Sequence, residues 1–322
     1  MKKTMKNVFA FALVLSLALG ISSIPASAAS VKGIVAPLTV TVNEDGEPMG
    51  TTIVSSWMDQ KGNFSPEFTS YKISADVYLP RSIFNNDGGK VFIDPMVSFW
   101  FPDLGTNGIL EDNEPIIIDF DRENNFPVWD NVFVKEASLV GDMIKVEIVD
   151  ATVNATLKTM EWDEASGSRV VWTDPIPEAG AGDACPLIMV ATDRAFKGKF
   201  AVANASIKIG DTEYKTDYSK KDTIGNYDGE AEGYNEVKAA SFNTSAVSVA
   251  KTSVKIKKKE STTVKVTTMF SGDKVKVSSS SSKVAKATYK SGKVTIKGLK
   301  KGKATVSVIA NGKTKKIKVT VK

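Results

Sequence analysis

Residues 304–321 read ATVSVIANGKTKKIKVTV, and this stretch decides the fold of the C-terminal part of the chain. On both sides of Asn311-Gly312, Val and Ile alternate with Thr, Ser and Lys, which is the period-two pattern of a strand with one buried face. An Asn-Gly pair between two such runs favours a two-residue type I′ turn, because both residues tolerate positive φ. The stretch therefore predicts an antiparallel β-hairpin.

The same alternation extends back from this hairpin to Val247. Glycine-containing turn signals at 271–273, 291–292 and 301–302 separate the runs. A spacing of roughly ten residues per strand is typical of small sandwiches. We therefore expect residues 247–322 to form a seven-strand β-sandwich whose aliphatic positions include Val254, Ile256, Val264, Val266, Val275, Val277, Val294, Ile296, Val306, Val308, Ile317, Val319 and Val321.

Three runs in this region, SSSSKVAKA at 279–287, GKVTI at 292–296 and KGKATV at 301–306, carry a family resemblance. In order and spacing they resemble the bacterial immunoglobulin-like domain of group 2, whose pattern is a serine pair, Val-Ala, Gly-x-Val-Thr and Gly-x-Ala-x-Val. Val277 departs from it, since the family often has a tryptophan before the serine pair. The resemblance implies a non-catalytic immunoglobulin-like sandwich, of the kind found in surface adhesins and as a spacer in secreted bacterial glycosidases.

Charge divides the chain at the same place. Residues 245–322 hold 21 lysines and two acidic residues, a net charge of +19, whereas residues 29–244 have a net charge of −17. Such a split favours two domains with different partners. The lysines either keep a strand face solvated or attract an anionic cell wall, and both readings stay open. We expect no nucleic-acid binding, because Phe270 and Tyr289 are the only aromatic residues there and arginine is absent.

The N-terminus has the pattern of an export signal. Lys2, Lys3 and Lys6 precede an apolar run that ends in small residues at 26–29, so residues 1–28 are predicted to be a signal peptide cleaved after Ala28. The alternative is an N-terminal membrane anchor, for which the run is short. We therefore expect a secreted, extracellular protein with no transmembrane segment after cleavage, and association with the cell wall stays open. Its single cysteine, Cys185, is expected to be a buried thiol.

Residues 29–217 are predicted to form a jelly-roll-like β-sandwich, which makes the whole chain all-β. Short β-like runs bounded by Pro, Gly, Asp and Asn recur through this region, and no 3.6-residue period appears. The expected strands are 72–79, 97–101, 116–120, 143–149, 153–162, 169–172, 186–191 and 200–209. The polar segment 218–246 is expected to be a linker, with loosely packed strands as the alternative.

All five tryptophans lie in this N-terminal domain, and we take them as candidate carbohydrate contacts: Trp57, Trp100, Trp129, Trp162 and Trp172. Alternation places Trp100 on the polar face of its strand. It does the same for Trp162 if 153–162 is one regular strand, although a bulge would reverse the assignment. Trp172 is expected to be a cross-strand neighbour of Trp162, across the turn at 165–167. Packing in the core is the alternative for each tryptophan.

Exposed aromatic rings on a rigid sheet suit sugar recognition. The C–H face of a pyranose lies flat on a ring, and nearby Asp and Asn side chains accept hydrogen bonds from its hydroxyls. In this respect the domain resembles the β-sandwich carbohydrate-binding modules of secreted bacterial glycosidases, with 71–80 and 196–205 resembling their first and last strands. The resemblance implies a polysaccharide partner.

The acidic residues of segment 103–123 suggest a further ligand. Seven Asp and Glu residues in what we expect to be one loop could hold Ca²⁺, although the spacing differs from that of an EF-hand. Solvated acidic residues are the alternative, and no other cofactor is expected.

The composition also limits the possible chemistry. The chain has no histidine, which excludes Ser-His-Asp and Cys-His catalysis and the usual zinc sites with histidine ligands. A glycosidase that uses a carboxylate pair stays open. The leading hypothesis is a secreted, non-catalytic polysaccharide-binding protein with a basic spacer or wall-association domain. The alternative is a cell-surface adhesin or structural protein that binds a protein or matrix partner.

Overall fold

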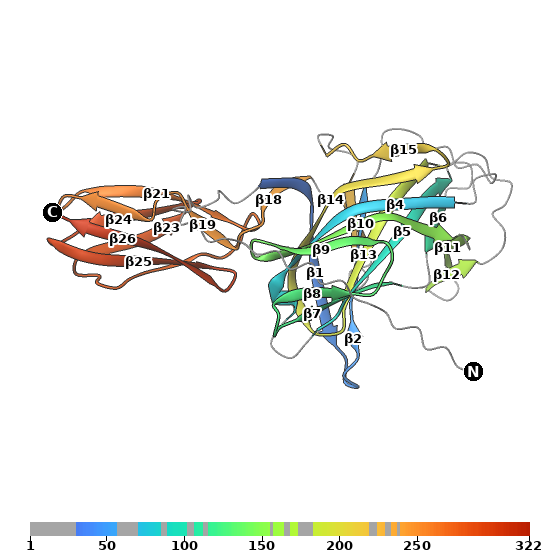
Figure 1. The fold of residues 1–322 in the computed structure, drawn as a ribbon, viewed down its shortest axis with the longest axis horizontal. Helices are drawn as coiled ribbons and strands as arrows, with labels where there is room; N and C mark the ends of the chain where they lie inside the picture. Colours follow the sequence, from blue (N-terminus) through green and yellow to red (C-terminus); the bar gives the residue numbers. More distant parts are fainter. Residues whose placement is uncertain are drawn as a thin grey trace, which may run out of the picture.

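The computed structural model describes residues 30–56, 70–84, 89–101, 106–111, 115–154, 157–163, 168–172, 183–218, 224–228, 233–236 and 239–322. Within these ranges, strands form four sheets, and the prediction of an all-β chain is confirmed. Figure 1 shows two bodies side by side along the long axis, a larger N-terminal one and a smaller C-terminal one. No helix in the described ranges has the length and apolar character that a membrane span requires.

The first sheet of the N-terminal domain has eight strands in the order β18-β1-β14-β4-β10-β9, with β2 beside β1 and β15 beside β14. All of its pairings are antiparallel. The short 3₁₀ helix η1 (Arg81–Ile83) follows β4. The strands are β1 (Ser30–Val42), β2 (Pro48–Met49), β4 (Ser70–Pro80), β9 (Val134–Val140), β10 (Met143–Asn154), β14 (Phe196–Ile209), β15 (Thr212–Lys215) and β18 (Ala240–Asn243).

The second sheet has ten strands in the order β12-β11-β6-β5-β13-β3-β16-β17, with β7 beside β5 and β8 beside β7. The expected strands 97–101, 116–120, 169–172 and 186–191 each lie within one of them. The strands are β3 (Thr52–Ser56), β5 (Val91–Phe101), β6 (Thr106–Glu111), β7 (Ile116–Asp121), β8 (Phe126–Trp129), β11 (Leu157–Asp163), β12 (Ser168–Trp172), β13 (Asp183–Thr192), β16 (Ile224–Asp228) and β17 (Gly233–Glu236).

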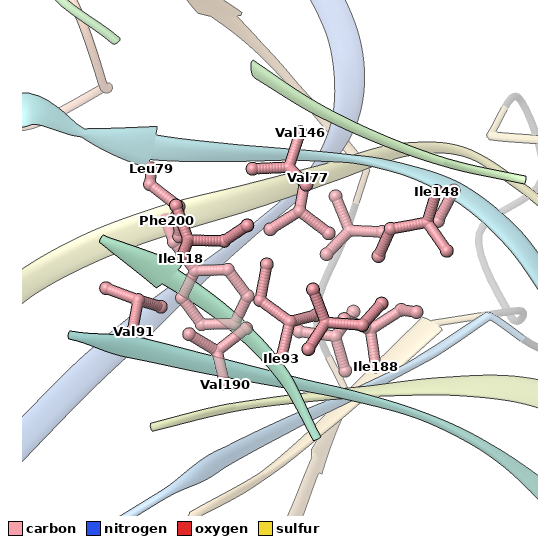
Figure 2. Packing of buried hydrophobic residues seen from close by; sticks show 14 of the residues in the cluster. Val77, Leu79, Val91, Ile93, Ile118, Val146, Ile148, Ile188, Val190 and Phe200 are labelled. Carbon is pink, nitrogen blue, oxygen red and sulfur yellow. The ribbon is translucent and has the colours of Figure 1, made fainter. Parts of the chain in front are cut away.

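The two sheets enclose one apolar core, part of which Figure 2 shows. Strict alternation supplies it: β4 sends the odd-numbered residues from Tyr71 to Leu79 inward, and each is at most 3% exposed. Branched aliphatic side chains dominate the core, as a pleated surface favours. The first sheet contributes Val77, Leu79, Val146, Ile148 and Phe200, and the second contributes Val91, Ile93, Ile118, Ile188 and Val190.

Segment 153–162, expected to be one strand, is in fact divided between the sheets. β10 ends at Asn154 in the first sheet, and β11 begins at Leu157 in the second. The prediction of a single strand is therefore wrong, and the alternation of β10 says nothing about the face on which Trp162 lies. Apolar and polar residues happen to alternate on both sides of the crossing, so the pattern did not reveal it.

Segment 218–246, expected to be a linker, instead completes both N-terminal sheets. β16 pairs with β3 and with β17, and β18 pairs with β1 in the register Val31↔Phe242. The linker prediction is wrong, and the alternative of strands agrees with these pairings. The strands are short and polar in composition, and they obtain their order from pairing with distant strands. Similarly, β4 and β14, expected to resemble first and last strands, are hydrogen-bonded neighbours within one sheet.

The C-terminal domain is a sandwich of two four-stranded sheets, β19-β21-β24-β23 and β20-β26-β25-β22. The Asn311-Gly312 turn has φ of 48° and 72°, which confirms the predicted hairpin between β25 and β26. Most of the predicted aliphatic positions form its core. The strands are β19 (Val247–Val249), β20 (Ser253–Ile256), β21 (Ser261–Thr268), β22 (Lys276–Ser279), β23 (Ala285–Lys290), β24 (Lys293–Gly298), β25 (Gly302–Ala310) and β26 (Lys313–Val321).

Two features of this domain differ from the prediction. It has eight strands rather than seven. Two of them were hard to recognise in the sequence, because β19 has only three residues and the inward positions of β23 are Ala285, Ala287 and Tyr289 rather than a row of aliphatic residues. In addition, β20 pairs with β26 in parallel, in the register Val254↔Val319, where an antiparallel partner was expected. Alternation reports which face is buried but carries no information on strand direction.

A ladder of charged residues covers part of the outer face of the first N-terminal sheet. Lys145 Nζ lies 3.0 Å from Asp76 Oδ1 and 3.3 Å from Glu147 Oε2, and Lys135 Nζ lies 2.6 Å from Glu147 Oε1. Hydrogen bonds from Lys135 and Lys145 hold the pKa of Glu147 below its usual range. Burial opposes the charge of Lys145, but its bonds to the two carboxylates outweigh that effect and raise its pKa. Adjacent strands are thus linked by ionised groups.

Candidate functional site

The structure describes the side chain of one of the five candidate tryptophans. Trp57 lies outside the described residues. Trp100 lies on β5, where its backbone is paired with Asn107 and Asp183, but its side chain is not among those described. The side chains of Trp162 and Trp172 are likewise outside the described part. Trp129, at the end of β8, is half-buried and packs against the main core.

The predicted pairing of Trp162 with Trp172 is wrong. β11 and β12 do form a hairpin across 164–167, but its register pairs Trp162 with Arg169 and Trp172 with Thr159. The two tryptophans are therefore three positions apart along the ladder and are not direct cross-strand partners. Trp162 lies one residue before the end of β11, whereas Trp172 is the fifth and last residue of β12, so the two cannot face each other across the ladder.

A shallow depression lies beside Trp129, on the hairpin that β7 and β8 form at an edge of the second sheet. The register pairs Ile118 with Trp129 and Asp119 with Val128. The depression has a volume of about 480 Å³, and its lining combines apolar and polar groups: Lys90, Pro115, Ile117, Asp119, Val128, Trp129, Asp130 and Asn131.

Apolar side chains are also exposed around this depression. Ile117, Phe126 and Val128 are each between 41% and 50% exposed, and the ring centroid of Phe126 lies 6.1 Å from that of Trp129. Apolar surface beside carboxylate, amide and ammonium groups suits a ligand with an apolar face and a hydroxylated rim. We call the lining residues together with Phe126 the β7–β8 depression.

The acidic segment 103–123 is not one loop, as was expected, because it contains β6 and β7. Asp121 accepts hydrogen bonds from Asn124 N at 3.0 Å and from Asn124 Nδ2 at 2.7 Å, which hold its pKa below the usual range. This carboxylate therefore shapes the turn between β7 and β8. Among the described residues, no group of three potential ligands is placed to hold a metal ion. Asp103, Asp112 and Glu114 lie outside the described ranges, and the Ca²⁺ prediction stays untested.

The lysines of the C-terminal domain form an extended basic surface. All 21 lysines of residues 245–322 are exposed, while the alternating aliphatic residues face inward. One of them, Lys313, reaches the N-terminal domain, where its Nζ lies 3.6 Å from Asp142 Oδ1. The surface has the charge needed to attract an anionic polymer, an attraction that salt would screen.

An apolar junction joins the two domains. The ring centroid of Phe242 lies 5.1 Å from that of Tyr78 in an edge-on arrangement and 6.2 Å from that of Phe270. Burial, with Asp76 nearby, raises the pKa of the Tyr78 phenol. The buried residues of the junction, each at most 6% exposed, are Tyr78, Met143, Ala201, Ala203, Phe242, Ala246, Met269 and Phe270.

Hydrogen bonds surround this apolar contact, and Asp142, in the turn between β9 and β10, makes several of them. Its backbone N–H donates to Thr244 O at 2.9 Å, and its Oδ2 accepts from Ala246 N at 2.9 Å. The preceding Gly141 has φ of 68°, and a Cβ there would lie 2.7 Å from Thr244 O. The turn therefore requires glycine, both for its backbone conformation and for the close approach.

Further hydrogen bonds cross from one domain to the other. Asn243 donates from its backbone N to Met269 O at 2.9 Å and from its Nδ2 to Thr268 O at 2.8 Å. Lys199 Nζ donates to Ser271 O at 3.2 Å. The junction thus combines buried aromatic rings with satisfied polar groups.

Sequence reasoning did not find the junction. Asp142 and Phe242 lie in a tight turn and in the segment expected to be a linker, so neither stood out in the alternation. One signal was present: Phe270 is among the few aromatic residues of a lysine-rich domain. An isolated aromatic residue beside a turn is the type of residue that a domain contact buries.

Comparisons with known proteins give no family assignment. No protein-family model and no curated protein matches the chain. Among solved structures, domains 4 and 5 of the S-layer protein SbsC are 21% identical over 30% of this chain and 63% of theirs, with a TM-score of 0.23.

Two further solved structures are similar at still lower identity. Domains 4–9 of the surface layer protein SbsC are 15% identical over 70% of this chain and 30% of theirs, with a TM-score of 0.23. A tandem of titin domains I9–I11 is 11% identical over 67% of this chain and 92% of theirs, with a TM-score of 0.19. The chain covers less than two thirds of each SbsC structure. At these TM-scores the likenesses add no argument on function, and the resemblances to group 2 immunoglobulin-like domains and to carbohydrate-binding modules stay predictions.

Proposed function

We propose that this protein is a non-catalytic, extracellular surface protein with a structural or adhesive role, in which the two sandwiches act as one stiff unit. The observation that carries the proposal is the buried junction around Phe242. Domains in one chain move relative to each other by default, unless their interface is large and apolar. Here three aromatic rings pack against one another between the domains, and Asp142 and Asn243 make hydrogen bonds beside them.

The basic surface of the C-terminal domain suits attachment. Its exposed lysines give a surface of one sign of charge, opposite to that of a wall polymer rich in phosphate or carboxylate. The N-terminal domain is acidic and is held away from such a polymer at the other end of the molecule (Figure 1). The arrangement supports a role in which one domain is retained and the other is presented.

Co-sedimentation of the full mature chain with purified bacterial cell walls tests this function. We expect the chain to pellet with walls that retain their anionic polymers, and less with walls from which these polymers were extracted. Retention should fall between 0.1 M and 1 M salt, because the Debye length shrinks from about 10 Å to about 3 Å. A chain that stays in the supernatant with walls and matrix gels alike, or that releases reducing sugars from them, would contradict the proposal.

Polysaccharide binding at the β7–β8 depression is a second candidate function. The observation that favours it is the half-buried Trp129, with Asp119 and Asp130 beside it and exposed Ile117 and Val128 next to them. Because the core already holds the side chain of Trp129, packing a sugar on it costs little conformational entropy. The carboxylates can accept hydrogen bonds from the hydroxyls of the sugar.

Affinity gel electrophoresis on a panel of polysaccharides tests this second function. We expect at least one neutral glycan to retard the chain, Trp129→Ala to abolish the retardation, and Trp129→Phe to retain part of it. Trp129→Ala should also lower the free energy of unfolding by about 2 kcal/mol, below the range for a fully buried ring, so the gels are run well below its Tm. The double variant Trp100→Ala/Trp162→Ala is the control: if it removes the retardation and Trp129→Ala does not, the depression is the wrong site.

A further inference from the structure

A groove of about 880 Å³ lies between the two domains. The N-terminal domain lines it with residues of β1, β14, η1 and the β7–β8 turn. The C-terminal domain lines it with Met269, Phe270 and Asp273 and with the Asn311-Gly312 turn between β25 and β26. Its volume lies within the range of about 300–1,000 Å³ typical of ligand sites. The groove exists only where the domains are docked.

The lining of the groove is basic, although the N-terminal domain as a whole is acidic. Five cations line it, namely Arg81, Arg122, Lys197, Lys199 and Lys313, against two carboxylates. Both carboxylates are engaged: Asp142 accepts from Ala246 N and pairs with Lys313, and Asp273 accepts from Phe270 N at 2.9 Å and from Asn311 Nδ2 at 2.6 Å. Four of the five cations belong to the N-terminal domain, so the part of this acidic domain that lines the groove is positively charged.

The fold holds two of these cations in place. The guanidinium of Arg81 lies over the ring of Phe120, 5.1 Å from its centroid, and hydrogen-bonds to Asn125 Oδ1. Lys199 is held by its bond to Ser271 O. The register Thr39↔Lys197 places Lys197 on the outer face of β14, where it is exposed. Two held cations beside the exposed Lys197 suit anionic oxygens that repeat along a chain.

Apolar surface lies between these charges. The ring of Phe196 folds over Gly198, where a Cβ would lie only 2.4 Å from its Cζ, and Pro37 is exposed beside Lys199. Glycine at 198 therefore leaves room for the ring, which lies in the lining of the groove and also packs against the main core. A ligand that carries only charge would gain little from these surfaces, whereas the C–H face of a sugar ring can pack on them.

We propose that the groove between the domains binds an acidic polysaccharide, through its carboxylate or phosphate groups. This inference rests on the extracellular role proposed above and names a partner for it. The cations would pair with the anionic groups, while Phe196 and Pro37 contact the sugar rings. Because residues of both domains line the groove, a bound glycan would also hold the domains together.

Isothermal titration calorimetry on the full mature chain tests the proposal with defined probes. Oligogalacturonate supplies carboxylates on sugar rings, a phosphomannan oligosaccharide supplies phosphates on sugar rings, and a neutral dextran oligosaccharide supplies neither anionic group. We expect one or both acidic probes to bind with a stoichiometry of one and the neutral probe not to bind; which acidic probe binds identifies the anionic group. The variant Arg122→Gln/Lys197→Gln, at two exposed positions, should weaken that binding about tenfold.

The matched control is Lys286→Gln/Lys297→Gln, which removes two exposed charges from paired positions of β23 and β24, outside the groove lining. It should change the affinity by less than about twofold, the effect of distant screened charges. Equal losses in both variants, no binding of either acidic probe, or equally tight binding of polyphosphate or single-stranded DNA would overturn the proposal. Wall retention of the groove variant separates the two hypotheses, because the basic surface alone should still retain it.

Discussion

Phe242→Ala is expected to lower the free energy of unfolding by about 3–5 kcal/mol, the range for deleting a fully buried aromatic ring. Phe242 is 0% exposed, and its ring contacts those of Tyr78 and Phe270. Its removal leaves a cavity in the cluster of buried residues between the domains. Among the described residues, this is the only buried cluster to which both domains contribute aromatic rings. Urea unfolding of the mature chain measures the loss. Small-angle X-ray scattering should show a larger radius of gyration, because the domains then move independently.

Phe126→Ala is the matched control, since it deletes the same ring from a position that is 50% exposed. Its expected cost is about 1 kcal/mol or less, as for most surface substitutions. If Phe242→Ala costs no more than Phe126→Ala and leaves the scattering unchanged, the junction does not hold the domains together. The two domains would then not form one stiff unit, and the proposed function, which depends on that unit, would be contradicted.

The C-terminal domain was the more predictable of the two, for a physical reason. Its strands face the core on one side and water on the other, so buried apolar residues alternate with exposed polar ones along the sequence. Val306 and Val308, for example, alternate with Thr305 and Ser307. Asn311-Gly312 identified the hairpin because few residue pairs accept positive φ twice. The parallel pairing of β20 with β26 was not predictable, since neither strand carries a local signal for its partner.

The strands of the N-terminal domain were predicted only in part, and their topology was not. The expected strands include β4, β5, β7, β10, β12, β13 and β14, but not β1, β3, β6, β8 or β9. β4 and β14 were recognised as short β-like runs, whereas their direct pairing depends on contacts between residues about 125 positions apart, such as Val77↔Val202. The crossing between Asn154 and Leu157 was invisible, because a chain that changes sheets can keep its alternation. The alternation of β10 therefore gives no basis for the face of Trp162, which stays untested. The candidate site is at Trp129 instead, whose face the sequence analysis did not assign.

Asp142→Ala is expected to lower the free energy of unfolding by about 1–3 kcal/mol, the cost of leaving a buried donor without an acceptor. Ala246 is 1% exposed, and its backbone N–H donates to Asp142 Oδ2. Deleting the carboxylate leaves that N–H without an acceptor, in a place with little access to water. Urea unfolding measures the loss, and hydrogen exchange at the Ala246 amide locates it.

Two further variants separate the hydrogen bond from the charge. Asp142→Asn keeps an oxygen for Ala246 N–H and loses only the pairing with Lys313, whose side chain is 51% exposed, so it should cost less than about 1 kcal/mol. Lys313→Gln should cost about as little. If Asp142→Asn proves as damaging as Asp142→Ala, the charge dominates, and the junction is held by long-range attraction between an acidic and a basic domain. If only the alanine variant is damaging, the junction is held by local satisfaction of buried groups. It should then stay closed at the salt concentrations that release the basic surface from a wall.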